Sequence, residues 1–376
     1  MRKILGTIAI GLAAALSLSA CSSTGASGET DGMPQQLVWS TYGTGTSTYA
    51  DLAAVGSALT SKTDTTVRII TSDTAIGRMG PLKQGKVNMA RTGNEYIYAF
   101  EADYDFASEE WGPQDVQLMW APVAPHGLMV KDSSAIQSYE DLRGSKFPRV
   151  TANPSVNNSL TAMLAYGGLT WDDVEPVDVS YGDQPDAVKS GQLDVLFQQV
   201  YGASLYELES AFPVRWLSMD DDSTERVEAA AEIAPYAVIG DFTGAPGQEE
   251  GELARAMMYT VPLIAYASTS ESVVYETVKA IHENYDVYKD STATTRAWSL
   301  DEANIVPTTV PFHAGTIKFL KENDAWSDEA AEKNQQLTER GQEMRAGWTD
   351  FIGSADKSNL AEEWASWKAD NLAPRS

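Results

Sequence analysis

The chain has 376 residues, which at about 150 residues per domain corresponds to two domains and an appendage. Its 53 acidic and 27 basic residues give a formal net charge of -26, which excludes a nucleic-acid-binding protein, because such a protein needs a basic face. A single cysteine excludes an intramolecular disulfide and a cysteine-based zinc site. The three histidines are far apart in the sequence, so we predict neither a metal nor a cofactor.

The first residues have the features of an export signal. Two basic residues precede an apolar run over 4–16, which is shorter than the roughly 20 residues of a membrane-spanning helix. Cys21 directly follows Leu18-Ser19-Ala20, an arrangement that resembles the bacterial lipobox, in which the cysteine is acylated. We predict a signal peptide over 1–20, a lipid anchor on Cys21 and a flexible tether over 21–35. The protein would then be exported and anchored to the outer face of the cytoplasmic membrane.

Strands and helices alternate in the first part of the body. The apolar pattern predicts strands over 36–40, 66–71 and 87–91. A helix extends to Leu59 between the first two strands, and a weaker helix follows residue 74. This alternation predicts an α/β fold with a parallel sheet.

The same alternation restarts near residue 127 and ends in a helical, polar tail beyond residue 324. Helices are predicted from 138 to 144, over 159–166, near 186–190 and over 273–288. The predicted strands cover 127–131, 149–152, 177–181, 193–198 and a long buried segment, 259–267. Two α/β units and a helical tail follow from this pattern.

Three polar turns separate predicted strands from predicted helices: 43–47, 72–74 and 155–159. Ligands of open α/β sheets bind where such turns converge, and the N–H groups at a helix start attract an anion. Each turn is also compatible with an ordinary helix cap, the commoner role of such residues. The three turns together favour a binding cleft between two lobes.

No catalytic motif is present in the sequence. It contains neither a Gly-x-Ser-x-Gly elbow nor a His-Glu-x-x-His motif, and its cysteine is assigned to the anchor. We therefore predict a binding protein and no enzyme, with an exported carboxylate-pair hydrolase as the alternative from another class.

Residues 41–49 resemble the Thr-Gly-Gly-Thr-Gly-Gly-Thr-Tyr-Tyr opening of the TAXI family of TRAP-transporter solute receptors. Ser190–Phe197 resembles the family's Asp-Gly-Lys-Ile-Asp-Ala-Phe-Phe segment. Further similar segments occur in the same order at 72–87, 127–144, 243–248 and 311–322, so that the likeness spans about 36–323.

This resemblance implies a two-lobe periplasmic-binding-protein fold of type II. Lobe I would comprise 36–123 and 262–325, lobe II 124–261, and a helical tail 326–376. The ligand would be a small organic acid, dicarboxylate or amino-acid-like, delivered to the membrane permease subunits of a TRAP transporter driven by an ion gradient. A receptor of an ATP-driven importer, with the same fold, is the alternative.

The chain departs from the family at Tyr42 and Thr46, which replace glycines, and at Asp73, which replaces a serine. Asp73 could receive an ammonium group, and Arg91 could either meet a ligand carboxylate or pair with one of the many acids. The residues expected to line the site are Thr44, Gly45, Thr46, Ser47, Tyr49, Ser72, Asp73, Thr74, Arg91, Asn94, Ser155, Asn157, Asn158 and Tyr201.

Overall fold

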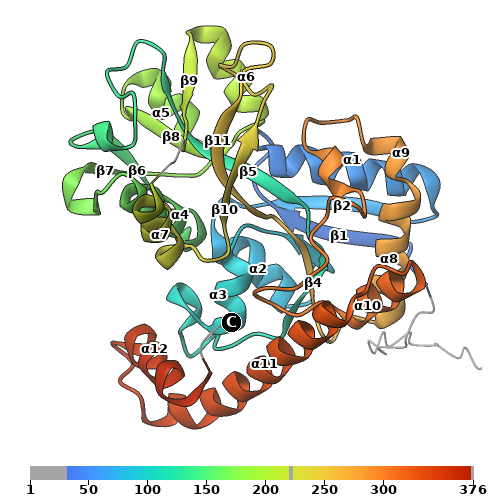
Figure 1. Cartoon of the computed structure of the whole chain (residues 1–376). Helices are drawn as coiled ribbons and strands as arrows, with labels where there is room; N and C mark the ends of the chain where they lie inside the picture. The colour runs from blue at the N-terminus through green and yellow to red at the C-terminus, as the bar shows by residue number, and fades with distance from the viewer. Residues whose placement is uncertain (1–31, 220–222, 374–376) are drawn as a thin grey trace, which may run out of the picture.

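The computed structural model describes residues 32–219 and 223–373. It has two α/β lobes and a C-terminal pair of helices, as expected (Figure 1). The signal peptide, Cys21 and most of the tether lie outside the described residues. None of the described helices combines the length and the apolar character that a membrane crossing requires.

Lobe I contains a five-stranded sheet of mixed direction. The order is β2-β1-β3-β12-β4, and β1 pairs in parallel with both β2 and β3. β12 runs antiparallel to its two neighbours, because the chain enters it from the other lobe, so the expected parallel sheet is parallel only in part. The strands are β1 (Gln36–Thr41), β2 (Thr66–Thr71), β3 (Met89–Arg91), β4 (Val116–Trp120) and β12 (Leu263–Tyr266).

Helices cover both faces of this sheet. The first face packs against α1 (Ser47–Lys62), α8 (Glu271–Glu283), α9 (Tyr285–Tyr288) and α10 (Ala314–Glu322). Leu52, Val55 and Leu59 of α1 are fully buried there, as their helical spacing predicts. The second face packs against α2 (Ala75–Lys83), α3 (Glu95–Glu101) and the tail helices α11 (Asp328–Ser354) and α12 (Leu360–Asn371).

Lobe II is built around the long strand β5 (Val123–Lys131), which pairs antiparallel with three other strands. The members of its sheet are β8 (Val195–Gln199), β9 (Val214–Leu217), β10 (Val238–Phe242) and β11 (Ala254–Thr260). A separate parallel pair consists of β6 (Lys146–Val150) and β7 (Glu175–Val179). The helices are α4 (Pro154–Tyr166), α5 (Gln184–Ser190), α6 (Ala203–Ala211) and α7 (Thr224–Ile233).

Two neighbouring segments connect the lobes. The chain leaves β4 for β5 at 121–122 and returns from β11 to β12 at 261–262, and the Val261 N–H donates to the Pro122 carbonyl at 2.9 Å. The single strand predicted over 259–267 is wrong, since Pro262 has no N–H for the ladder and interrupts it.

Three predicted helices differ from the structure. The helix predicted over 273–288 is divided at Asn284 into α8 and α9. The segment after residue 138 forms only a 3-10 turn, Glu140–Leu142. The helix predicted to begin at Ser159 begins at Pro154, because Asn153 caps it and a proline is favourable in the first turn. Ser155, Asn157 and Asn158 therefore lie within the first turns of α4.

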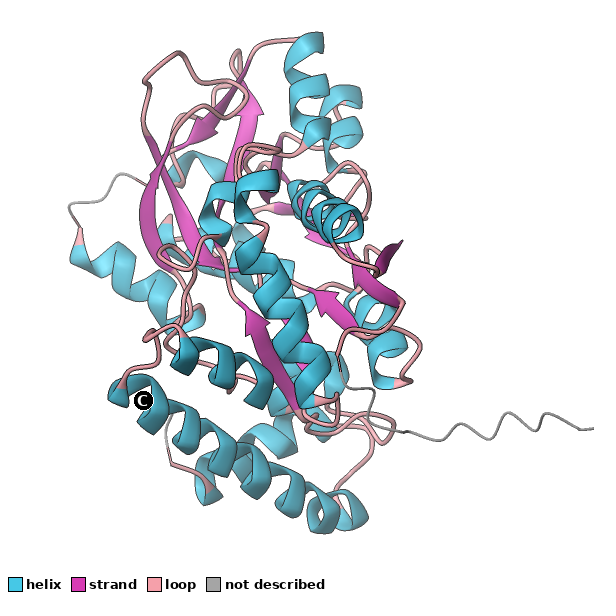
Figure 2. Ribbon diagram, turned by 90° about the vertical axis from the view of Figure 1, so that its right-hand side faces the viewer, coloured by secondary structure: helices cyan, strands magenta, loops and turns pink. Residues whose placement is uncertain are grey.

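The tail packs against lobe I along one edge of the molecule, as the views in Figures 1 and 2 agree. The buried Glu101 at the end of α3 accepts hydrogen bonds from Arg340 of α11, at 2.8 and 3.0 Å, and from Lys368 of α12 at 3.3 Å. The Trp364 indole N–H donates to the Glu101 carbonyl at 2.7 Å, and Trp364 is fully buried. A charged anchor and an aromatic anchor thus hold the tail.

Candidate functional site

The two lobes touch through direct hydrogen bonds. Thr48 of α1 donates to the Gln199 side-chain carbonyl at 2.8 Å, and the Ser204 N–H of α6 donates to the Gly45 carbonyl at 3.2 Å. Directly before α3, the Asn94 N–H donates to the Ser155 hydroxyl at 2.7 Å. The lobes are therefore in a closed arrangement, and the polar turn before α1 and the residue before α3 lie at the junction.

A buried ion pair lies beside this junction. The Arg78 Nε is 2.6 Å from the Glu95 Oε1, and both side chains are fully buried. The Arg78 guanidinium stacks over the Tyr42 ring at 3.5 Å, and the Tyr42 hydroxyl donates to Glu95 at 3.3 Å. Burial is the largest single influence on Arg78 and lowers its pKa. The charge and hydrogen bond of Glu95, together with Tyr42 and the charge of Asp73, outweigh burial and raise that pKa, so Arg78 stays a cation.

Aromatic rings from lobe II border the same region. Tyr181 lies 5.1 Å from Tyr42, ring centroid to centroid, and its hydroxyl accepts the Gln199 N–H at 3.3 Å. His126 stacks on Tyr259 at 4.0 Å. Burial lowers the pKa of His126 to about 3, so the imidazole is neutral at neutral pH and adds no charge to the junction.

Several buried polar atoms at the junction have no hydrogen-bond partner among the described residues. Asn94 is 1% exposed, yet neither its amide oxygen nor its amide nitrogen is bonded. Buried polar groups in native proteins are nearly always hydrogen-bonded, since an unpaired one costs about 1–3 kcal/mol. This group, which we call the unpaired set, consists of Thr41 Oγ1, Asp73 Oδ1, Arg78 Nη2, Thr92 Oγ1, Asn94 Oδ1 and Nδ2, and Gln199 Nε2.

The unpaired set comes from the ends of β1, β3 and β8 and from the start of α2. It offers both donors and acceptors, so it can bind a small solute that carries both kinds of group. A solute between the lobes would also stabilise their closed arrangement. We take the unpaired set as the candidate ligand site.

Two of the residues predicted from the sequence, Asp73 and Asn94, belong to the unpaired set. Gly45 and Ser155 lie next to it, in the contacts between the lobes. Asn94 is the residue before α3 but makes no side-chain cap bond, so its amide remains available.

Other predicted residues are committed to local structure. Thr46 and Thr74 cap α1 and α2 by accepting the Tyr49 and Gly77 N–H groups, at 3.2 and 3.1 Å. The Asn157 amide bonds both the N–H and the carbonyl of Val150, at 2.8 Å each, and so ties α4 to β6.

The remaining predicted residues have other surroundings. The Ser72 hydroxyl lies 3.3 Å from that of Thr74, and Ser47 makes the same contact with Thr294. Asn158 accepts from Tyr236 at 2.8 Å, and Tyr201 donates to the Thr243 carbonyl at 2.8 Å. Thr44 is exposed, and Tyr49 is half-buried.

Arg91 is committed within the protein. Its guanidinium donates to Asp51 at 3.0 Å, to the Thr48 carbonyl at 2.7 Å and to the Val261 carbonyl at 3.3 Å. Of the two roles considered for Arg91, the structure shows the pairing with an acid. Both members of this ion pair are buried, so the pair does not lie on the surface. We leave Arg91 out of the candidate site.

Sequence analysis missed Thr41, Arg78, Thr92 and Gln199. Arg78 had a recognisable signal, since it occupies the helical stripe formed by Ala75, Met79 and Leu82, where an apolar residue is expected. The other three carry no local signal, because threonine and glutamine at strand ends are ordinary.

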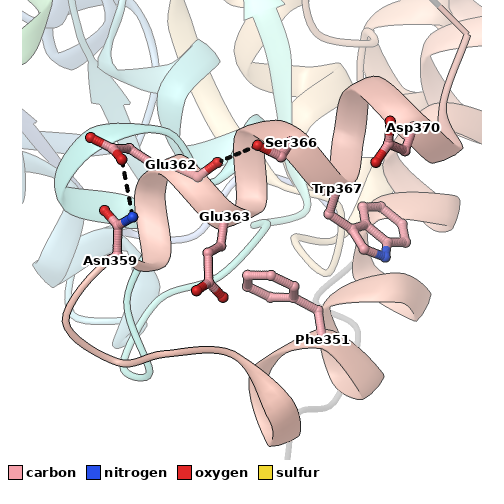
Figure 3. Close-up of a pocket in the computed structure, with 7 residues that line it drawn as sticks. All are labelled: Phe351, Asn359, Glu362, Glu363, Ser366, Trp367 and Asp370. Atoms are coloured by element: carbon pink, nitrogen blue, oxygen red, sulfur yellow. Dashed lines mark hydrogen bonds between the residues drawn. The ribbon is translucent and has the colours of Figure 1, made fainter.

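A hollow of about 420 Å³ lies in the tail, beside α12 (Figure 3). Two of its three acidic side chains are bonded locally: Glu362 accepts from Asn359 at 3.0 Å, and Glu363 accepts the Asp356 N–H at 3.1 Å. The third acidic residue that lines it is Asp370. Within the described ranges, no cluster of three His, Cys, Asp or Glu residues could hold a metal ion.

Residues 40–323 match the NMT1-like family. No curated protein matches the chain. Three similar solved structures are the alkanesulfonate-binding protein SsuA from Xanthomonas axonopodis pv. citri bound to MOPS, the periplasmic aliphatic sulphonate binding protein SsuA from Escherichia coli, and the substrate binding protein of an amino acid ABC transporter. In the same order, their sequence identities to this chain are 15%, 14% and 14%, and the TM-scores of the superpositions are 0.45, 0.39 and 0.41. The alignments cover 85%, 77% and 68% of this chain and 93%, 88% and 96% of those chains.

Proposed function

The chain belongs to the NMT1-like family, a family of transporter solute-binding proteins, and from this premise we propose that it is the exported receptor of a membrane importer. The receptor closes its two lobes on a small solute and delivers it to a permease. The observation that carries this proposal is the unpaired set, since its buried polar atoms have no hydrogen-bond partner and three of its residues, Asp73, Asn94 and Gln199, adjoin contacts between the lobes.

The proposed cycle uses the two connecting segments as hinges. When the lobes separate, the atoms of the unpaired set and the side chains of Thr48 and Gln199 become exposed to water. When a solute binds, it replaces that water and the lobes close over it. The receptor changes no covalent bond, and the buried His126, the histidine nearest to the junction, is held by the Ala124 carbonyl at 3.1 Å.

The class of importer is the finer part of this proposal. The resemblance to TAXI receptors favours a TRAP transporter driven by an ion gradient. The match to the NMT1-like family gives that class no support, so we take the alternative, an ATP-driven importer, as the working assignment. A permease gene beside the gene for this chain distinguishes the two, because the two classes use unrelated membrane subunits.

We further propose that the mature receptor is held at the membrane by a lipid on Cys21. The Cys21→Ser variant is expected to move from the membrane fraction to the soluble exported fraction, since it lacks the acylated thiol. Membrane retention of this variant in cells without the permease would exclude the anchor.

The decisive experiment on the receptor compares wild type with Asn94→Leu. A thermal-shift panel of organic acids, amino acids, amines, sulfonates and sugars should contain at least one compound that stabilises the wild-type protein. Leucine is close to asparagine in size and has no polar atoms, so the variant should lose at least tenfold in affinity while its ligand-free melting temperature stays equal or rises.

Asn371→Leu on α12 is the matched control, and its affinity should equal that of wild type. A lower ligand-free melting temperature of Asn94→Leu with intact affinity would assign Asn94 to structure and remove the unpaired set from the ligand site. A panel in which no compound stabilises the wild-type protein would contradict the receptor proposal.

A further inference from the structure

The buried charges at the junction limit the chemistry of the solute, if the proposed receptor function holds. Two arginines and two acids pair off there: Arg78 with Glu95 at 2.6 Å, and Arg91 with Asp51 at 3.0 Å. Asp73 is the fifth charged residue. Among the described residues it forms no ion pair, although its charge acts on Arg78 and helps to raise the pKa of that arginine. These five residues together therefore carry a net charge of one negative.

Asp73 lies on the line where the lobes meet. A Cβ atom added to Gly43 of lobe I would lie 3.1 Å from the Asp73 Oδ1, and one added to Gly182 of lobe II would lie 3.1 Å from its Oδ2. Asn153, which caps the helix α4 of lobe II, donates to the Asp73 carbonyl at 3.2 Å. Closure therefore brings both lobes around this carboxylate, and its Oδ1 is buried without a hydrogen bond.

We propose that Asp73 binds a protonated amino group of the solute, and that the receptor takes amine-bearing solutes and rejects dicarboxylates that lack an amine. An ammonium supplies what Asp73 Oδ1 lacks, a donor and a positive charge. The unpaired nitrogens of Arg78, Asn94 and Gln199 then serve the acceptor atoms of the same solute.

A dicarboxylate would bring two more negative charges next to an unpaired one. Both arginines already have carboxylate partners, so neither supplies a surplus positive charge. Burying like charges together without compensation is strongly unfavourable. Asp73 thus acts as a specificity determinant as well as a contact.

The test uses pairs of compounds that differ in the amine alone. Calorimetric titration is run with glutamate and 2-oxoglutarate, alanine and lactate, and putrescine and 1,4-butanediol. In at least one pair, the amine should bind wild type at least tenfold more tightly than its partner. Asp73→Asn keeps the shape and removes the charge, so it should reduce that preference by about ten- to a hundredfold.

Asp64→Asn is the control, since it removes one exposed carboxylate from the same lobe and should leave the preference unchanged. If Asp73→Asn does not fold, Asp73→Ser is measured in the same way. Two results would overturn this inference and leave the receptor function intact. In the first, the compound without an amine binds as tightly as its amine-bearing partner. In the second, a solute from the wider panel that has no amine closes the lobes. A wild-type protein that binds no compound of either set would overturn both.

Discussion

At the scale of single residues, the structure differs from an ordinary α/β protein in the charged groups that it buries between its lobes. Arg78 and Glu95 have no exposed side-chain area, and Tyr42 covers one face of the guanidinium. Such a pair depends on both members, because either one left alone is an uncompensated charge in an apolar environment.

Arg78→Met should lower the free energy of unfolding by about 3–5 kcal/mol, because it leaves Glu95 buried without its partner. The double variant Arg78→Met with Glu95→Leu should recover part of that loss. Urea denaturation measures both variants. Arg149→Met is the control, since its pair with Asp178 is exposed and its midpoint should not change. A single variant as stable as wild type would contradict the prediction.

His126 should make stability depend on pH. Burial lowers its pKa to about 3 in the folded chain, against 6.5 when unfolded, so acid favours the unfolded state. The contribution of the neutral His126 to the free energy of unfolding is fully present above pH 6.5 and is lost as the pH falls toward 3. His126→Phe keeps an aromatic ring in the stack on Tyr259 and does not titrate.

Between pH 7 and pH 5, wild type should therefore lose about 2 kcal/mol more stability than His126→Phe does. Urea denaturation midpoints at several pH values give this difference, in which the contributions of the many carboxylates cancel. Parallel pH profiles for the two proteins would show that His126 titrates normally in the folded chain.

At the scale of elements, α3 connects the candidate site with the tail. It begins directly after Asn94 and ends at Glu101, where α11 and α12 attach. The tail also completes the second face of the lobe I sheet, since Met344 and Trp364 are fully buried in its core. We therefore expect the tail to be required for the stability of lobe I.

Glu101→Gln should loosen the tail, because it leaves the nearly buried cation of Arg340 without its carboxylate and leaves Lys368 with Asp103 alone. The expected loss is about 3 kcal/mol, the size of a broken buried ion pair. Limited proteolysis should then cut α11 and α12 before lobe II. Glu109→Gln is the control, since it removes only the exposed pair with Lys357. Equal cleavage rates in Glu101→Gln and wild type would contradict this role of Glu101.

At the scale of the whole molecule, the important property is the relation between the lobes. They are joined by two segments and touch through a few hydrogen bonds, including Thr48 to Gln199 at 2.8 Å. A solute that binds between them should shift the population toward the closed form, which is the more compact one.

Small-angle scattering should show this compaction when a solute that binds is added at saturation. Thr48→Val removes one bond that exists only when the lobes are closed, so it should weaken affinity about fivefold, in line with about 1 kcal/mol for a hydrogen bond. The stability of the ligand-free protein should change little. Thr349→Val in the tail is the control. An unchanged radius of gyration with bound solute would exclude closure.

Local patterns in the chain predict much of the secondary structure and the fold class. β2 begins and ends where its β-branched run predicts, and α1 and α2 begin at the hydroxyl caps of their polar turns. Asp73 and Asn94 were also predicted as site residues from the sequence, Asp73 because polar residues in turns after strands of α/β sheets often meet a ligand. These features depend on residues that are neighbours in the chain.

Which buried polar residues have partners depends on the tertiary structure. Arg91 pairs with Asp51, 40 residues away, whereas Arg78 has a nitrogen without a partner, and no local pattern separates the two. Gln199 meets Thr48 across 151 residues because the chain crosses between the lobes twice. Periodicity reports which face of an element is buried, but the partner of a buried polar group depends on how distant elements pack.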